Sequence, residues 1–571
     1  MSSLHFQSKV LLLIVAQTVA HASDLSDLEE PTNQTPPLVS FLNILHTGVE
    51  PGIDWGWWGV VANVEAGHVW SVHEFLPRVA QFVHDPKMVD SDANPLTPEY
   101  DRHATGVASF LEGPTPIELH SGALATKWSG KAYSGNFSTT PQAMATVYGA
   151  FFGLVDVINS SWGGHDPTGD SFPALITDGL ANQYPSTTFI ASVGNSGPEP
   201  NTVGGPGSGY NNIAVGSLQN TQGQDTVAGF SSRGPHDYSD PNGVVLKVRA
   251  EVDLVAPGTD LTMAYYGGQS GGNHPSLLGS TPVAGTSRIA NNVKGTSFSA
   301  PMVANVATQL HQVAKNIPGL LENRYARDAR VIKSVLLNSA DKIPGWDNGQ
   351  RVDANGKIIT TQSLDWASGA GALNMSKVYD QYLTAGTRDV VGLSSGSIQP
   401  VGWDYGQVGL GNTNFYRMDE ILQANTQLTV TLNWFRDRTF DTRDMVFQDL
   451  GQANLDLFVR DVISNRVIAE SSSIHNVVEH LFFTLPTASL YQIEVAYNRN
   501  LFGQLKKEEY GLAWSAKPVR QQKLEGSPKA RVEPHPQSAL PAEPHLPRMA
   551  ARVARPKAAG VHPRGGWLVA K

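Results

Sequence analysis

Short apolar runs alternate with segments of helical periodicity from about residue 38 to residue 380. Residues 59–64, 155–159 and 188–193 have the pattern of buried strands, and residues 144–154 have the spacing of a helix. This alternation is typical of βαβ units and predicts an α/β fold with a mainly parallel sheet flanked by helices. Functional groups gather at the carboxyl ends of strands in such sheets, so we expect the chemistry in the turns that follow them.

After about residue 387 the period changes to two. Leu428, Val430, Leu432 and Trp434 alternate with mostly polar residues. Further short strands are expected at 455–459, 467–468, 481–483 and 491–495. This pattern predicts an all-β sandwich or jelly-roll domain over residues 387–515. Residues 516–571 are rich in Pro, Ala, Lys and Arg with little apolar periodicity, which predicts a disordered basic tail.

The N-terminus has the pattern of a secretory signal peptide. Lys9 precedes an apolar run at 10–16, and Ala-His-Ala at 20–22 predicts cleavage before Ser23. The run is too short to span a bilayer, and no later segment is apolar enough to do so. We therefore expect residues 1–22 to be a signal peptide, the protein to be secreted, and no integral membrane segment to be present.

Composition narrows the classes of function. The 571 residues exceed one ordinary core, which predicts several domains. The net charge is −10, and residues 516–571, with 11 Lys/Arg and 3 Asp/Glu, contribute +8, which leaves −18 for the rest. An acidic body argues against nucleic acid as the main partner. The absence of cysteine excludes disulfides, thiolate metal sites and cysteine catalysis.

The strongest chemical signal is the segment GTSFSAP at residues 295–301, followed by an apolar helix. Ser297 at the start of that helix has a free backbone N–H and the positive end of the helix dipole, which favours a developing oxyanion. A plain helix cap is the alternative for an isolated serine. His103 in RHATGVAS, Asn195 in ASVGNSG and the segment SSWGG at 160–164 argue against that alternative, because each lies at a strand end or a helix start.

These segments, in this chain order, resemble the subtilisin-like serine peptidases of the S8 family over roughly residues 50–380. Four further segments resemble signatures of the same family: FSSRGP at 230–235, VAPG at 255–258, LLNSA at 336–340 and GAG at 369–371. The resemblance implies a subtilisin-like peptidase domain, for which we take residues 23–386, and a serine endopeptidase activity on protein or peptide substrates. It implies no cofactor for catalysis, and we expect a monomer.

Roles follow from the resemblance residue by residue. Ser297 would attack the substrate carbonyl, and His103 would act as its general base. Asn195 would donate to the oxyanion together with the Ser297 backbone N–H. Ser161, Trp162 and Gly163 resemble the segment that pairs with an extended substrate and walls its main specificity pocket.

The acid position departs from the family, which has an aspartate in a D-x-G turn where this chain has Glu65-Ala66-Gly67. Either carboxylate can hold the histidine tautomer, so Glu65 is our candidate acid. The alternatives are Asp54, which precedes the strand, and an enzyme weakened in catalysis. Glu65 also motivates a rival function, a pseudopeptidase that binds peptides or cell-wall material without cutting them.

Other departures and rivals concern smaller segments. The 42 residues from 23 to 64 leave no room for a folded prodomain, and residues 267–292 have the composition of an insertion or extended loop. The segment NLDLFV at 454–459 resembles the prepeptidase-type β-sandwich modules of secreted bacterial proteases. In such modules an aspartate such as Asp456 sometimes binds structural calcium, and an ordinary sheet-face carboxylate is the alternative.

Two other hydrolase classes fit the sequence poorly. GQSGG at 268–272 matches an esterase motif but lacks the helix that must follow the serine. His475 and the Glu479-His480 pair miss the zinc-hydrolase spacings.

Overall fold

The computed structural model describes residues 59–70, 76, 79–85, 101–111, 126–132, 140–221, 224–265, 281–282, 289–385 and 396–518. Four of the sequence predictions therefore lie outside the described residues: the signal peptide at 1–22, Asp54, the GQSGG segment and the tail beyond Pro518. In the described part, no helix has the length and apolar character needed to cross a membrane.

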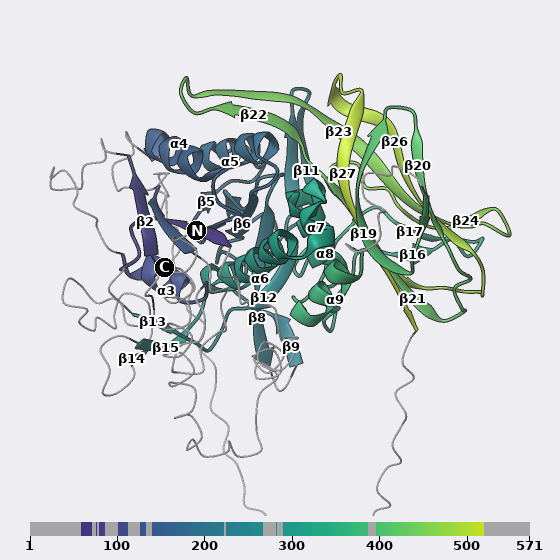
Figure 1. The fold of residues 1–571 in the computed structure, drawn as a ribbon, viewed down its shortest axis with the longest axis horizontal. Helices are drawn as coiled ribbons and strands as arrows, with labels where there is room; N and C mark the ends of the chain where they lie inside the picture. The colour runs from purple at the N-terminus through teal and green to yellow at the C-terminus, as the bar shows by residue number, and fades with distance from the viewer. Residues whose placement is uncertain are drawn as a thin grey trace, which may run out of the picture.

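A parallel sheet forms the centre of the N-terminal part (Figure 1). Its strands in spatial order are β12 (Leu254–Pro257), β8 (Ile213–Thr221), β6 (Thr188–Ser192), β4 (Val157–Ser160), β1 (Val60–Glu65), β3 (Thr126–Lys131) and β2 (Val79–His84). Strand β9 (Gln224–Val227) pairs antiparallel with β8, and every other pairing is parallel. The predicted α/β class and mainly parallel sheet are therefore confirmed.

Helices cover both faces of this sheet, which explains why its central strands are apolar throughout. The long helix α6 (Thr296–Asn316) packs against β4, β6, β8 and β12 on one face, whereas α4 (Thr140–Phe151) and α5 (Phe172–Gln183) cover the other. The other helices in the described part of the chain are α3 (Arg102–Ala108), α7 (Pro318–Leu321), η3 (Arg324–Arg327), α8 (Ala329–Asn338) and α9 (Met375–Ala385). Along β1, Val61 joins the core under α6, whereas Ala62 and Val64 join the core under α4 and α5.

Small sheets flank the parallel sheet in the described N-terminal residues. They pair β5 (Gly164–His165) with β7 (Gly204–Gly205), β10 (His236–Asp240) with β11 (Gly243–Arg249), and β15 (Ile289–Val293) with β13 (Leu261–Ala264) and β14 (Thr281–Pro282). The end of the predicted 267–292 insertion therefore belongs to a strand, because residues 289–292 lie in β15, which pairs with β13.

The C-terminal region consists of β-sheets (Figure 1). One sheet has the order β16 (Arg351–Val352), β17 (Ile358–Thr360), β24 (Arg466–Ser471), β23 (Val446–Asp461), β26 (Tyr491–Gly503), β20 (Thr413–Met418) and β18 (Gly396–Ile398), with β22 (Asp437–Asp441) paired to β23. The other has the order β19 (Val401–Gly409), β27 (Lys507–Pro518), β21 (Thr426–Trp434) and β25 (Val478–Thr484). Buried side chains from both sheets, such as Val430 in β21 and Leu457 in β23, share one apolar cluster.

The structure adds two details at the borders of the C-terminal region. Strand β27 runs to Pro518, so the first three residues of the predicted tail pair with β21, where Ala516 lies opposite Leu428. Strands β16 and β17, which lie within the predicted peptidase domain, join the C-terminal sheet through β24. Sequence patterns missed this pairing because it joins segments more than a hundred residues apart.

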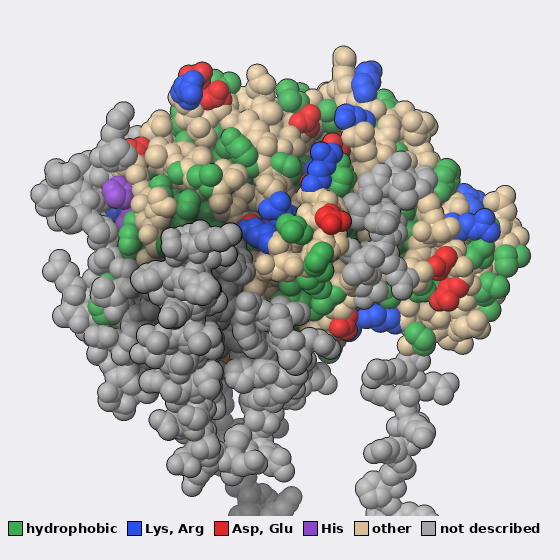
Figure 2. All heavy atoms as spheres, viewed as in Figure 1, with side chains coloured by type: hydrophobic (Ala, Val, Ile, Leu, Met, Phe, Trp, Pro, Cys, Tyr) green, Lys and Arg blue, Asp and Glu red, His purple; other side chains and the backbone are tan. Residues whose placement is uncertain are grey.

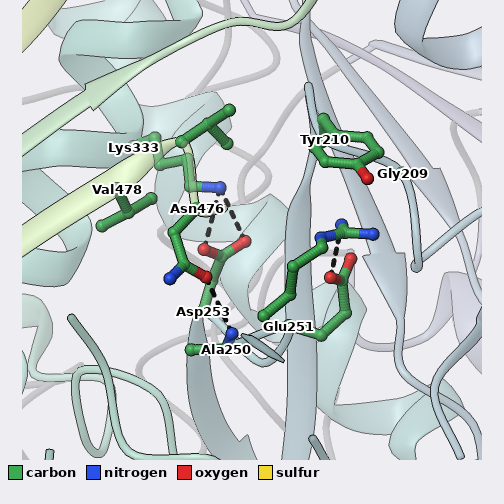
Figure 3. Close-up of a pocket in the computed structure, with 10 residues that line it drawn as sticks. Gly209, Tyr210, Ala250, Glu251, Asp253, Lys333, Asn476 and Val478 are labelled. Atoms are coloured by element: carbon green, nitrogen blue, oxygen red, sulfur yellow. Dashed lines mark hydrogen bonds and ion pairs between the residues drawn. The ribbon is translucent and has the colours of Figure 1, made fainter. Parts of the chain in front are cut away.

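The N-terminal and C-terminal parts are tied together by buried polar groups. The guanidinium of Arg438 on β22 is fully buried and lies 2.9 Å from the carboxylate of Asp178 on α5, which is also fully buried. Arg438 also pairs with Asp170 and donates to the carbonyl of Gly169. A small polar pocket lies at the same junction (Figure 3), where Arg249 pairs with Glu251, Lys333 pairs with Asp253, and Asn476 accepts from the backbone of Ala250.

Candidate active site

The candidate residues meet at the carboxyl edge of the parallel sheet. Glu65 is the last residue of β1, Ser160 is the last residue of β4, and Asn195 follows the end of β6 by three residues. Since the three strands are parallel neighbours, their ends lie along one edge. Helices α3 and α6 bring His103 and Ser297 to that edge.

Helix α3 is short, and its start is fixed by side-chain bonds. The carboxylate of Asp101 caps the helix by accepting from the backbone N–H of Ala104 at 2.8 Å. Thr105 donates to the Asp101 carbonyl, and its hydroxyl accepts from the N–H of Trp70. These bonds fix the first turn of α3, which includes His103.

Glu65 contacts His103 directly. Its Oε2 lies 2.9 Å from Nδ1 of the imidazole, although the two residues are 38 positions apart in the chain. When Nδ1–H donates to the carboxylate, Nε2 is left as the free, basic nitrogen. The glutamate side chain is 1% exposed and the histidine side chain 24% exposed, so the acid is enclosed while the base reaches the surface.

The surroundings of this pair shift both pKa values upward. Burial raises the pKa of the Glu65 carboxyl, and the attraction of His103 offsets part of that effect. Burial favours neutral His103, but the negative charge of Glu65 and the hydrogen bond to it outweigh burial and raise the pKa of the imidazole. Asp101 adds to the upward shift of His103. The pair therefore favours a protonated imidazole, the state that forms when a general base has taken a proton.

Ser297 is the second residue of α6, so its backbone N–H has no acceptor within the helix. Gly295, which precedes the helix, has a φ of 153°, a conformation that side chains disfavour. The Ser297 hydroxyl donates to the carbonyl of Ser161 at 3.0 Å. No hydrogen bond joins Ser297 to His103, both of which the structure describes.

Asn195 is oriented by the residue before the serine. Its Oδ1 accepts from the backbone N–H of Thr296 at 2.9 Å and from the Thr296 hydroxyl at 3.0 Å. Because both bonds hold the oxygen, the amide orientation is fixed and the NH₂ group is left for other acceptors. That NH₂ nitrogen lies 3.5 Å from where a Cβ on Gly295 would be, beside the loop that leads to Ser297. The arrangement suits donation to an oxyanion formed at Ser297.

The segment after β4 links the acid to the serine. The N–H of Ser161 donates to Oε1 of Glu65 at 3.3 Å, while its carbonyl accepts from Ser297. Trp162 is half-buried against the core under α4 and α5. A Cβ on Gly163 would lie 2.7 Å from the carbonyl oxygen of Gly205, so this position admits only glycine without a backbone shift.

The structure thus brings together all the candidate site residues: Glu65, His103, Ser161, Trp162, Gly163, Asn195 and Ser297. Sequence reasoning missed two buried asparagines beneath them, Asn63 and Asn159, which bond to each other at 3.0 Å. The sequence held one indication of them: Asn63 is a polar residue inside the otherwise apolar run of β1.

In the described part of the chain, no group of three or more His, Asp or Glu side chains is placed to hold a metal ion. Asp456, the candidate calcium ligand, accepts from Asn454 at 3.3 Å and from Asn498 at 2.7 Å.

The family assignment follows from comparison with known proteins. A model described as the subtilase family, peptidase S8, matches residues 60–399, which is more than half of the chain. The chain therefore belongs to the subtilase family.

Curated relatives match over shorter stretches. Subtilisin of Bacillus sp. (strain TA39) is 33% identical over 157 residues, which cover 27% of this chain and 31% of the relative. Serine protease AprX of Bacillus subtilis (strain 168) is 26% identical over 167 residues, covering 27% of this chain and 34% of the relative. The matched part thus spans about a third of the length of these relatives.

Solved structures similar to this chain include fervidolysin from Fervidobacterium pennivorans, with 15% sequence identity and a TM-score of 0.41, covering 82% of this chain and 78% of that one. The serine protease of Aeromonas sobria has 12% identity and a TM-score of 0.41, covering 81% of this chain and 88% of that one.

Proposed function

We propose that this subtilase is a serine endopeptidase that hydrolyses peptide bonds through an acyl-enzyme on Ser297. His103 is the general base, and Glu65 takes the place of the family's aspartate. The observation that carries the proposal is the convergence of these groups from three distant segments. Oε2 of Glu65 lies 2.9 Å from His103, and the backbone of Ser161 joins Oε1 of Glu65 to the hydroxyl of Ser297.

The proposed reaction has two half-reactions. Once its hydroxyl turns from the Ser161 carbonyl, Ser297 attacks the scissile carbonyl while its proton passes to Nε2 of His103. The Asn195 amide and the Ser297 backbone N–H stabilise the oxyanion. His103 then gives its proton to the leaving amine, and the peptide C–N bond breaks. Water, deprotonated by His103, hydrolyses the ester and restores the serine.

Glu65 acts through His103 in this scheme. Its carboxylate keeps the proton on Nδ1 in the resting state and stabilises the imidazolium that forms during each half-reaction. Enclosure strengthens this interaction because the carboxylate has little contact with water. The bond from Ser161 N–H holds the second oxygen, so the longer glutamate side chain has a fixed orientation.

A pseudopeptidase that binds peptides or cell-wall material without cutting them is the second candidate. The observation that favours it is the Ser297 hydroxyl, which bonds to the Ser161 carbonyl instead of to His103. Catalytic hydrogen bonds are often absent or long before substrate binds, which is why we favour the peptidase.

We further infer the setting of the enzyme. The N-terminal pattern supports a signal peptide at 1–22 and secretion. The peptidase domain and the C-terminal strands, taken as a β-sandwich, act as one unit with protein or peptide substrates, without a catalytic cofactor, and as a monomer. Nucleic acid is not proposed as a partner; Figure 2 shows acidic and basic side chains interspersed on the face in view.

Hydrolysis of casein and of short fluorogenic peptides by purified protein tests the proposal, with Ser297→Ala as the control. We expect turnover by the wild type, and loss of at least about 10³-fold in the variant. Peptide binding with equal, negligible hydrolysis by both proteins would favour the pseudopeptidase.

A further inference from the structure

Asn63 is an unusual residue for its place in the fold. It lies in the middle of β1, a strand buried on both faces, and its side chain is 1% exposed. An asparagine here costs stability unless its polar atoms are bonded. By the two-residue period of a strand, Asn63 faces the same side of the sheet as Glu65, toward α3 and α6.

Both ends of the Asn63 amide are bonded, each to a segment that carries site residues. Its Nδ2 donates at 3.1 Å to the carbonyl of Ala104, the residue after His103. Its Oδ1 accepts at 3.0 Å from Nδ2 of Asn159, its direct neighbour in the β1–β4 register. The amide thus fastens α3 to β1 and β1 to β4.

The Asn159 amide continues the chain of bonds. Its Nδ2 also donates to the hydroxyl of Ser161 at 3.1 Å, and the Ser161 backbone in turn bonds to Glu65 and to Ser297. The bonds therefore run from the helix that carries His103, through two buried amides, to the residue that contacts both other members of the proposed triad.

We propose that Asn63 is a positioning residue for the proposed triad. By tying the backbone beside His103 to the strand that ends in Glu65, it sets the Glu65–His103 contact. Asn63 touches neither substrate nor a reacting atom, and it acts through α3. This inference rests on the proposed function for its effect on turnover, but the placement of His103 can be measured without turnover.

The test compares Asn63→Leu with a matched control, Asn433→Leu. Leucine has the same branched shape and the same number of side-chain heavy atoms as asparagine, and it removes both amide bonds. Asn433 is also a fully buried strand asparagine, and its Nδ2 donates to a helix carbonyl, that of Arg330 in α8, and to the hydroxyl of Ser334. The control loses the same kind of bonds in the C-terminal region. Asn63→Val, with a β-branched side chain suited to a strand, replaces Asn63→Leu if the latter does not fold.

The first readout is the pKa of the His103 imidazole, measured by NMR titration of ¹⁵N-histidine-labelled full-length protein. His103→Gln assigns the signal among the 17 histidines. The charges that act on His103 are Glu65 and Asp101. If α3 shifts, the raising effect of Glu65 weakens while burial still lowers the value, so the pKa falls in Asn63→Leu. It stays at the wild-type value in Asn433→Leu.

The second readout is steady-state hydrolysis. We expect kcat of Asn63→Leu to fall by about 10²-fold, as for a displacement of about 1 Å, with KM nearly unchanged. Asn433→Leu keeps kcat even where it lowers Tm. An unchanged His103 pKa in Asn63→Leu, or an equal shift in both variants, overturns the proposal. If the wild type does not hydrolyse peptides, the proposed function fails, and the NMR titration alone still decides the role of Asn63.

Discussion

Shortening the proposed triad acid by one methylene, Glu65→Asp, introduces the aspartate that the resemblance to the subtilases implies at this position. The backbone of Glu65 is fixed, because β1 pairs with β3 and β4 on its two sides. Removing a methylene withdraws the carboxylate by about 1.5 Å, the length of a C–C bond, so the separation from Nδ1 rises from 2.9 Å to about 4 Å. That distance is too long for a hydrogen bond.

The expected result is a loss of activity, although aspartate is the acid that the family resemblance implies. A displacement of this size costs about 10²-fold in kcat, or about 2.7 kcal/mol in the barrier. The void left in this buried position costs about 1 kcal/mol of stability. The raising effect of Glu65 on the pKa of His103 weakens at the same time, so the acid limb of kcat/KM moves to lower pH.

Steady-state kinetics across pH with one fluorogenic peptide measure both effects, and Tm is followed in parallel. Glu65→Gln is the comparison variant, expected to lose about 10⁴-fold because the amide can hold the wrong tautomer. If Glu65→Asp equals or exceeds the wild type, the backbone adapts to either acid, and the reasoning from the fixed strand end is wrong.

Four further predictions follow from the described contacts. Asn195→Ala should lower kcat by about 10²–10³-fold with little change in KM, since the amide donates mainly to the transition state; an equal rise in KM would contradict this. In the wild type, activity should rise with pH through the raised pKa of His103, so the midpoint in a kcat/KM profile should lie above the ordinary histidine value of about 6.5. Arg438→Met should destabilise the protein by about 3–5 kcal/mol in urea unfolding, because the buried carboxylate of Asp178 loses its ion pair and keeps the backbone N–H donors of Tyr210 and Asn211. Arg460→Met should cost less than about 1 kcal/mol, since the ion pair of Arg460 with Glu494 is partly exposed. Deleting residues 519–571 should leave kcat/KM on a soluble peptide unchanged, and a large loss would show that the tail contributes to the site.

Local patterns were sufficient to predict the parallel sheet and, to within one residue, the ends of β1, β4 and β6. The apolar run before Glu65 forms most of β1 (Val60–Glu65). In the C-terminal region, the alternating residues Leu455, Leu457 and Val459 all lie in the apolar core. Phe458, which breaks the alternation in sequence, is half-buried on the outer face of β23. These features depend on neighbours in the chain, which is why the sequence carries them.

Contacts between distant segments could not be predicted in this way. The partners of Asn63 lie 41 and 96 residues away, so nothing near Asn63 in the chain identifies them. The same holds for Arg438 and Asp178, which are 260 residues apart and join the two parts of the molecule. The Ser161 backbone links to Glu65 and Ser297 were equally hidden, because a backbone group has no residue-type signal.

The most direct test of the central claim is covalent labelling of the nucleophile. Full-length protein is treated with a fluorophosphonate, and the adduct is located by peptide mass spectrometry in the wild type and in His103→Ala. We expect a single adduct on Ser297 in the wild type and a much slower reaction in His103→Ala. Labelling of another serine, or no labelling of the folded protein, would contradict it.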